Sequence, residues 1–307
     1  MARVLVTGGA GFIASHVVDL LVDKGYECVI VDDLSAGENN INEHAKFYKV
    51  DIRNMARLKQ VFAKEKPDFV VHAAAQVQVV RSTEDPVYDA SINIVGGINV
   101  LECCRLFKTR KAVYMCTGGA LYGEPKYLPA DEEHPILPIS PYGASKHSLE
   151  LYFYLYNYNY GLDFVSLRFS NVYGPRDSPK SGRVIPNFVA KMLKHQPPFI
   201  TGDGTQGRDF IYVQDVAQAV VMSLDKKTKS RFLNIGTEQV VSINEIYQVA
   251  ESILTTGIKP NYVPKRPGEV QQIYLKAKLA KQELGWQAKV GIKEGLKNYI
   301  EWARNKS

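Results

Sequence analysis

Two reactive side chains stand four residues apart in the sequence, where Tyr142 and Lys146 follow Pro141. On a helix, residues at this spacing lie on one face, about 6 Å apart along the axis. A lysine ammonium beside a tyrosine stabilises the phenolate, so the pair predicts a tyrosine pKa below its ordinary value of about 10. Such a phenolate can remove the proton of a substrate hydroxyl while a hydride leaves the same carbon. In isolation the pair is typical of an exposed helix face, so its meaning depends on other motifs.

A glycine turn near the N-terminus supplies the first of these motifs, Thr7-Gly8-Gly9-Ala10-Gly11-Phe12-Ile13-Ala14. It follows a short apolar run and opens a helical pattern. Glycines there give a tight turn and let a pyrophosphate approach bare backbone N–H groups at a helix N-terminus. Ala14 replaces the usual third glycine and still permits close helix–strand packing. Without a second signal, the motif is equally typical of an ordinary strand-to-helix turn.

The second signal is Asp32, which ends the next apolar run about 20 residues after the turn, the spacing typical of a dinucleotide site. A carboxylate there accepts hydrogen bonds from ribose hydroxyls and repels a 2′-phosphate. No Arg or Lys occurs from Asp32 to Asn40, so the sequence predicts NAD rather than NADP. Asp51 and Ile52 follow the third apolar run. They either frame the adenine, or Asp51 caps the helix that starts near Met55.

The chain positions these motifs with strands and helices that alternate through its first half. We predict strands at 4–6, 27–31, 47–50, 69–73, 112–116 and 164–169, and helices at 12–24, 55–64, 87–107 and 142–160. Short apolar strands between amphipathic helices predict an α/β fold with a doubly wound, Rossmann-like parallel sheet. After Asn171 the sequence is rich in Pro and Gly and predicts a smaller C-terminal α+β substrate lobe. The expected boundaries are 1–170 for an NAD-binding domain, to which 210–235 returns with a helix at 210–224, and 171–307 for the second lobe.

Composition excludes several classes of protein. The 307 residues are 45% hydrophobic and 23% charged, which argues against disorder, collagen and coiled coils. The net charge is 38 − 32 = +6 without a clustered basic stripe, so we expect no nucleic-acid partner. Four cysteines are too few and too irregularly spaced for a disulfide framework or a zinc site. We therefore expect no metal, reduced thiols and a cytoplasmic location, with neither a signal peptide nor a membrane span.

Further motifs extend over nearly the whole chain. They are His72-Ala73-Ala74-Ala75-Gln76, Asn93, Tyr122-Gly123, Pro141 to Lys146, Arg168 to Arg176, Gly207 to Val216 and Arg266-Pro267-Gly268-Glu269. With these motifs and the glycine turn in this order, the chain resembles the extended short-chain dehydrogenase/reductase superfamily. Within that superfamily it is most similar to the UDP-glucose 4-epimerases.

The resemblance implies a redox cycle at C4 of a UDP-hexose. Tyr142 removes the O4 proton, and the C4 hydride passes to NAD. The transient 4-keto sugar then rotates about its diphosphate and regains the hydride on its other face. Lys146 tunes Tyr142 and holds the nicotinamide ribose. The implied cofactor residues are Gly8, Gly11, Phe12, Ile13, Asp32, Asp33, Leu34, Ser35, Gly37, Asp51, Ile52, Ala73, Ala74, Ala75, Gln76, Asn93, Tyr142, Lys146 and Val172.

The resemblance also implies a firm grip on the UDP group by the second lobe. Arginines suit this task because a guanidinium presents a two-pronged set of donors to phosphate oxygens. Asn171, Arg208 and Arg266 are expected on the diphosphate, and Glu269 on the uridine ribose. The full set of implied substrate residues is Thr117, Gly118, Asn171, Arg183, Val184, Arg208, Arg266 and Glu269.

One position departs from the family pattern. The family usually carries a serine or threonine where this chain has Gly118, and we expect Thr117 to serve as the third catalytic residue instead. Gly119 and Ala120 follow where nucleotide-sugar 4,6-dehydratases need an Asp-Glu pair to protonate a leaving hydroxyl and abstract at C5. Dehydration is therefore disfavoured.

Several alternatives stay open. Ile273 falls near the family's gate beside the hexose 2-substituent, so UDP-GlcNAc/UDP-GalNAc is the second choice of substrate, followed by another nucleotide-sugar oxidoreductase activity. A nonenzymatic NAD-binding sensor is the alternative of a different class, although it would have no use for Tyr142 and Lys146. The alternating tyrosines at 152–160 are either buried rings with hydroxyls at the rim or the face of a homodimer, formed with the helix at 87–107.

Overall fold

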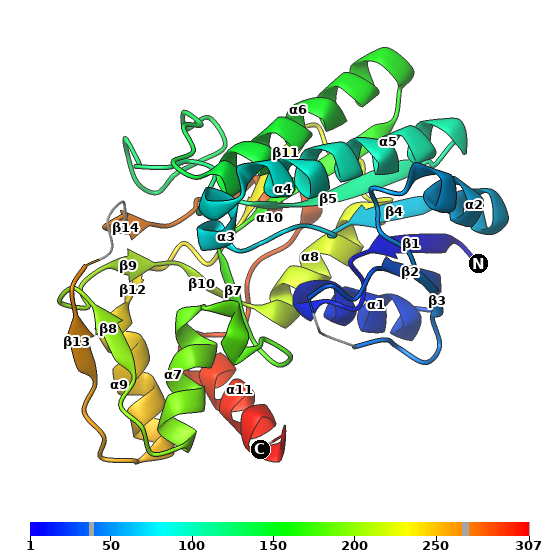
Figure 1. The fold of residues 1–307 in the computed structure, drawn as a ribbon. Coiled ribbons are helices and arrows are strands. Elements are labelled where there is room, and N and C mark those ends of the chain that lie inside the picture. Colours follow the sequence, from blue (N-terminus) through cyan, green and yellow to red (C-terminus); the bar gives the residue numbers. More distant parts are fainter. Residues whose placement is uncertain (37–39, 266–269, 307) are drawn as a thin grey trace.

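The computed structural model describes residues 1–36, 40–265 and 270–306. Three residues with predicted roles, Gly37, Arg266 and Glu269, lie outside the described residues. Within the described part, seven parallel strands form one sheet in the order β11-β6-β5-β4-β1-β2-β3 (Figure 1). Their bounds are β1 Arg3–Thr7, β2 Glu27–Asp32, β3 Lys46–Lys49, β4 Phe69–His72, β5 Lys111–Thr117, β6 Asp163–Phe169 and β11 Phe232–Ile235. The predicted doubly wound α/β fold is confirmed.

The central strands are apolar on both faces because helices cover both sides of the sheet. In β1, Val4 and Val6 belong to one core while Leu5 between them belongs to the other, as the two-residue period of a strand requires. The first core includes residues of α1 (Phe12–Asp23), α8 (Val213–Asp225) and α10 (Lys278–Leu284). The second includes residues of α2 (Met55–Glu65), α5 (Gly97–Leu106) and α6 (Pro141–Tyr160).

The order of the strands sets where a ligand can bind. β1 lies between β2 and β4: the chain runs from β1 outward to β2 and β3, then crosses back to β4 on the other side of β1, so the winding direction reverses there. A crevice opens at such a point, beyond the carboxyl ends of the strands, and is where open α/β sheets bind ligands. The glycine turn follows β1, and the His72-Ala73-Ala74-Ala75-Gln76 run begins at the end of β4.

A third core forms the smaller lobe, at the lower left of Figure 1. Residues of α7 (Val184–Leu193), α9 (Ile243–Leu254) and α11 (Ile292–Lys306) build it. Short strands complete the lobe in three small sheets: β7 (Asn171–Tyr173) with β10 (Phe210–Tyr212), β9 (Gly207–Arg208) between β12 (Val241–Ser242) and β14 (Gln272–Ile273), and β8 (Phe199–Thr201) with β13 (Asn261–Val263).

The predicted regular helix at 87–107 is wrong in its middle. Here α3 (Val79–Glu84) and α4 (Pro86–Ala90) lead into a wider, π-helical turn at Ser91–Gly96 before α5 begins. Hydrophobic periodicity does not predict such a turn, which inserts one residue per turn and is frequent at functional sites. The predicted helix at 210–224 also starts late, because Phe210–Tyr212 pairs with β7 as a strand.

The alternating tyrosines of α6 do not form a buried aromatic layer. Tyr152, Tyr154, Tyr158 and Tyr160 are exposed, and Tyr156 is half-buried with its hydroxyl on Glu102. The interpretation of these residues as buried rings is therefore wrong for four of the five.

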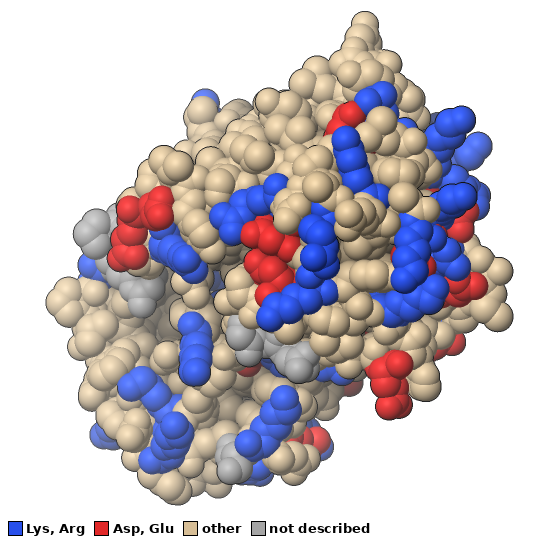
Figure 2. All heavy atoms as spheres, turned by 45° about the vertical axis from the view of Figure 1, so that its right-hand side comes forward, with Lys and Arg blue, Asp and Glu red and all other residues tan. Residues whose placement is uncertain are grey.

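Charged side chains are mixed over the face drawn in Figure 2, with acidic groups lying between basic ones. Within the ranges that the structure describes, no helix is long and apolar enough to span a bilayer.

Candidate active site

Helix α6 begins at the carboxyl edge of the sheet and carries the Tyr142–Lys146 pair. Ser140 caps it by accepting a hydrogen bond from the Gly143 amide at 3.1 Å, and Pro141 occupies its first turn. A Cβ on Gly143 would stand 2.3 Å from the Ala120 carbonyl oxygen. The first turn therefore packs directly on the loop that follows β5, which brings Tyr142 next to the end of that strand.

Lys146 is buried, with 4% of its surface exposed. Its Nζ donates to the Met115 carbonyl oxygen at 2.8 Å and lies 4.5 Å from the centre of the Tyr114 ring. Burial lowers the pKa of this ammonium, while Cys116, Glu150 and Asp89 act in the opposite direction. The ammonium is thus fixed beneath the first turns of α6.

Tyr142 is half-buried, and its phenol shares a hydrogen bond with the Thr117 hydroxyl. Burial raises the pKa of the phenol well above its ordinary value, and Arg183 and Thr117 reduce this effect. This direction is opposite to the lowered pKa that the helix spacing predicted, because loss of solvation by the phenolate outweighs its charged neighbours.

Position 118 has no room for a side chain. A Cβ on Gly118 would lie 2.4 Å from Cδ1 of Leu275, a fully buried residue just after β14. The Gly118 amide donates to the Phe169 carbonyl oxygen at 2.7 Å, which holds the loop against β6. Thr117 is the hydroxyl nearest to this departure from the family pattern, and it contacts Tyr142. Sequence reasoning missed Leu275, since only the folded chain brings it to Gly118.

The glycine turn has the geometry of a phosphate cradle. Gly8 has a φ of +70°, and a Cβ there would lie 2.7 Å from the Ala74 amide nitrogen. Gly11 caps α1 without a side-chain hydrogen bond to the first N–H groups, so that helix N-terminus is suited to an anion. Thr7 joins the two strands of the crevice: its hydroxyl lies 2.8 Å from His72 Nδ1 and accepts from the Ala73 and Ala74 amides.

Asp32 closes the turn from the neighbouring strand. Its carboxylate accepts from the Ala10 amide at 3.0 Å and the Leu34 amide at 2.8 Å. Burial raises the pKa of Asp32, and these two amides oppose the shift. Asp33 similarly accepts from the Ser35 amide and hydroxyl.

The alternative role of Asp51 as a helix cap is wrong, because Asn54 caps α2 by accepting from the Arg57 amide. Asp51 instead forms an ion pair with Arg53 at 2.6 Å, which lowers the pKa of its carboxyl. Ile52 is buried against the π-helical turn, where a Cβ on Gly96 would lie 2.6 Å from its Cδ1.

The loop after β4 is tied to the π-helical turn by buried amides. Asn93 accepts from the Gln76 amide at 2.8 Å, and its Nδ2 donates to the Gln76 carbonyl oxygen at 3.0 Å and the Ser145 hydroxyl at 3.0 Å. Asp89 accepts from both Gln76 and Asn93. Sequence reasoning named Gln76 and Asn93 but missed Asp89 and Ser145.

The remaining predicted cofactor residues lie around the same crevice. Phe12 and Val172 are buried in the first core, and Ile13 packs against that core. Ala73, Ala74 and Ala75 are half-buried in the loop after β4.

Two predicted substrate residues, Thr117 and Gly118, lie at the end of β5, and the other described ones come from the smaller lobe and from the segment that leads into it. Arg183 precedes α7, pairs with the buried Asp177 at 2.5 Å and lies over the Phe12 ring, 5.2 Å from its centre. Val184 begins α7 and is half-buried. The backbone N–H of Asn171 donates to the Asp209 carbonyl oxygen at 2.9 Å, and Nη1 of Arg208 donates to the Gly207 carbonyl oxygen at 2.8 Å. Arg183 thus links the start of α1 to the smaller lobe.

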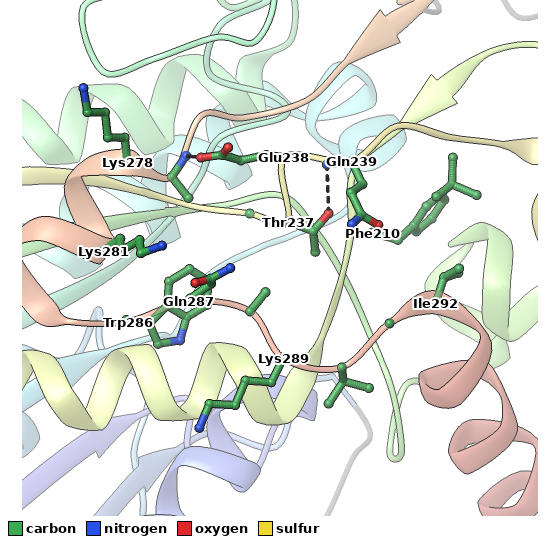
Figure 3. Close-up of a pocket in the computed structure, with 16 residues that line it drawn as sticks. Phe210, Thr237, Glu238, Gln239, Lys278, Lys281, Trp286, Gln287, Lys289 and Ile292 are labelled. Carbon is green, nitrogen blue, oxygen red and sulfur yellow. Dashed lines mark hydrogen bonds between the residues drawn. The ribbon is translucent and has the colours of Figure 1, made fainter.

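A separate cavity of about 240 Å³ lies near α10 and the loop after β11 (Figure 3). Lys281, Trp286 and Gln287 lie together on one side of it, opposite Phe210 and Ile292. Its described lining includes none of the predicted catalytic, cofactor or substrate residues. Among the residues that the structure places, no group of three or more His, Cys, Asp or Glu side chains gathers to hold a metal ion.

Comparison with known proteins agrees with this geometry. A protein of Methanocaldococcus jannaschii, provisionally named a UDP-glucose 4-epimerase, is 46% identical over 98% of both chains. The UDP-glucose 4-epimerase of Thermotoga maritima, solved with UDP-glucose, is 39% identical, has a TM-score of 0.97 and covers 99% of both chains.

A third relative has a different named substrate. The UDP-N-acetylglucosamine 4-epimerase of Methanobrevibacter ruminantium, solved with UDP-N-acetylmuramic acid, is 32% identical with a TM-score of 0.93, and the match covers 100% of this chain and 99% of that one. Residues 4–236 match the NAD dependent epimerase/dehydratase family. With a matched segment of this length and relatives of this similarity, the chain belongs to the NAD dependent epimerase/dehydratase family.

Proposed function

We propose that the protein is an NAD-dependent isomerase that inverts C4 of UDP-glucose and UDP-galactose through a transient 4-keto sugar. The observation that carries this proposal is the contact of the Tyr142 phenol with Thr117, at the start of the helix that also carries the buried Lys146. The family and the names of the relatives support the same reaction.

The residues at the crevice fit NAD. The cradle at Gly8, which a Cβ would fill, and the α1 N-terminus without a side-chain cap suit a pyrophosphate. Asp32 suits the adenosine ribose, and its negative charge disfavours a 2′-phosphate. NAD bound there would supply the acceptor and donor of the C4 hydride. We assign this role to residues 1–170 with 210–235, and assign nucleotide-sugar binding to 171–307.

The chain's own residues manage the proton. Tyr142, as phenolate, takes the O4 proton when the keto sugar forms and gives it back when the product alcohol forms. Thr117 donates a hydrogen bond at the same centre, because its hydroxyl already contacts the phenol. Lys146 contributes a positive charge that its hydrogen bond to the Met115 carbonyl oxygen holds in place. The high pKa of Tyr142 disfavours the phenolate, so removal of the O4 proton by Tyr142 requires cationic groups nearby.

The smaller lobe holds the UDP group in this proposal. Arg208 and Arg266 provide guanidinium groups for the diphosphate, with Asn171 beside them. Glu269 is assigned to the uridine ribose, and Arg183 to the lining of the same substrate pocket. A firm grip on UDP and a loose one on the hexose let the keto sugar present either face.

The N-acetylated pair UDP-GlcNAc/UDP-GalNAc is the second candidate substrate. The relative named as a UDP-N-acetylglucosamine 4-epimerase supports it. Ile273, near the expected gate, is buried in β14, and its intermediate size does not separate the two substrates.

The proposal includes a cytoplasmic homodimer. Exposed apolar side chains, including Val95, Leu106, Leu151 and Leu155, cover the outer surfaces of the π-helical turn and of α5 and α6. An exposed apolar patch on neighbouring helices favours a protein interface, and a second copy of the chain would cover it symmetrically.

The test is to incubate the purified protein with UDP-galactose, with and without added NAD, and to resolve the products by proton NMR. We expect UDP-glucose to form without net NADH. Tyr142→Phe should lose about 10²–10⁴-fold in kcat, whereas the exposed Tyr158→Phe on the same helix should stay active. Normal turnover by Tyr142→Phe would refute the mechanism. If wild type leaves UDP-galactose unchanged, conversion of UDP-GalNAc would select the second substrate. Binding of NAD without turnover of either sugar would favour a sensor.

A further inference from the structure

A buried carboxylate lies behind the Tyr142–Lys146 pair and has no part in the mechanism above. Asp89 of α4 is 1% exposed. Its Oδ1 accepts from Gln76 Nε2 at 2.8 Å and from Asn93 Nδ2 at 3.1 Å. Its Oδ2 is equally buried and has no hydrogen-bond partner among the described residues. A buried carboxylate oxygen without a partner costs free energy, so stability alone does not explain an acid at this position.

Asp89 is connected to the reacting helix by a short path of hydrogen bonds. Asn93, which donates to Asp89, also donates to the Ser145 hydroxyl at 3.0 Å. Ser145 in turn donates to the Tyr142 carbonyl oxygen at 3.0 Å. Asp89 thereby helps to fix the loop after β4 and the first turn of α6 in one arrangement.

The charge of Asp89 also reaches the acid–base pair. It raises the pKa of both Tyr142 and Lys146. Other groups also act on these two side chains. They include His72 of β4, Tyr114, Cys116 and Thr117 of β5, Glu150 of α6, and Arg183, which directly precedes α7. Glu150 is already neutralised by Arg168 at 3.0 Å. Within the described ranges no cation forms an ion pair with Asp89.

We propose that Asp89 is a positioning residue of the epimerase reaction, which holds Gln76 and Asn93 at the cofactor crevice and acts through its negative charge on Tyr142 and Lys146. This inference rests on the proposed function, because it requires Tyr142 to exchange protons with the substrate. Asp89 itself touches neither reacting group through a hydrogen bond in the described structure.

Asp89→Asn separates charge from hydrogen bonding. The amide oxygen can accept the same two hydrogen bonds as Oδ1, and the NH₂ group takes the place of Oδ2, which has no partner among the described residues. Removing a nearby negative charge lowers the pKa of each group that the charge had favoured in its protonated form. We therefore expect the whole pH profile of kcat to move to lower pH by about one unit, with KM for the UDP-sugar nearly unchanged.

The matched control is Asp85→Asn, one turn earlier on the same segment. Asp85 is exposed and caps α4 by accepting from the Tyr88 amide, and asparagine caps helices equally well. It loses the same charge at the surface, so its pH profile should overlay that of wild type. Asp89→Ala, which also removes both hydrogen bonds, should lower kcat further at every pH and lower the Tm.

Two results would overturn the role of Asp89. One is a folded Asp89→Asn protein whose pH profile coincides with that of wild type. The other is an Asp89→Asn protein that fails to fold, which would make the carboxylate structural. Failure of the proposed function looks different, since Tyr142→Phe would then stay active or wild type would turn over no UDP-hexose.

Discussion

Gly118 and Leu275 are matched in size, because the Leu275 side chain occupies the space that glycine leaves at position 118. A Cβ at Gly118 would meet Cδ1 of Leu275 at 2.4 Å, and Leu275 is 1% exposed. We expect Gly118→Ala to cost about 1–3 kcal/mol through overpacking, and Leu275→Ala about 2–5 kcal/mol through a cavity. The double variant should be more stable than the sum predicts, because the new methyl enters the space that leucine vacates.

Urea unfolding of the four proteins in this cycle measures the coupling. A coupling of about 0.5–3 kcal/mol in favour of the double variant is expected for residues in contact. Strict additivity would mean that Leu275 does not determine what position 118 accepts. The same four proteins can be assayed for turnover, and we expect Thr117 to keep its role in the double variant.

At the scale of elements, a buried ion pair fastens α6 to β6. Glu150 accepts from Arg168 Nε and Nη2, both at 3.0 Å, and from the Ser166 hydroxyl at 2.6 Å; both charged side chains are buried. Arg168→Leu leaves the carboxylate buried without its cation and should cost about 3–5 kcal/mol at pH 7. Glu150→Met combined with Arg168→Leu should recover much of this loss, because neither charge then remains.

The stability lost in Arg168→Leu should depend on pH in a predictable direction. Burial acts to raise the pKa of Glu150, but the hydrogen bonds from His147, Arg168 and Ser166 and the charge of Arg168 outweigh it and hold this pKa below its usual range. In wild type the resulting stability is present above the unfolded pKa of about 4.3 and is lost as the pH falls through the lower, folded value. In Arg168→Leu the carboxyl binds its proton more readily, so the stability gap should narrow from pH 7 toward pH 4. Thermal unfolding measured across this range would contradict the account if the gap stayed constant.

Elements were predictable to the extent that local pattern determines them. The continuous apolar run at Val4–Val6 predicts a strand buried on both faces, and the doubly wound sheet is confirmed. The π-helical turn at 91–96, in which Asn93 is buried, was missed because hydrophobic periodicity does not distinguish it from a regular α-helical turn. The Asp89 and Leu275 contacts join residues through the tertiary fold, and the phenol pKa depends on burial. Periodicity therefore gives the scaffold, while the environment of the site requires three-dimensional contacts.

At the scale of the whole molecule, the outer face of α6 predicts self-association. Leu151, Leu155 and Tyr158 are 50%, 44% and 77% exposed, and an uncharged stripe of this kind is unusual on a surface that meets only water. Leu155→Glu would place a charge within the buried centre of the proposed dimer. We expect the variant to sediment as a monomer in sedimentation velocity. High salt should restore the dimer only if the introduced charges repel each other across the interface.

Phe199→Glu, an equally exposed apolar position in β8 of the smaller lobe, is the control and should leave the dimer intact. If wild type already sediments as a monomer, the stripe is not a self-interface. The α6 stripe begins at Leu151, about one and a half turns after Lys146, on the helix that carries Tyr142, and that helix packs on the π-helical turn holding Asn93. Dimer formation would therefore brace the first turn of α6 from outside. A monomeric Leu155→Glu protein should lose kcat more than it raises KM for the UDP-sugar, since the residues proposed to bind the substrate phosphates lie in the smaller lobe.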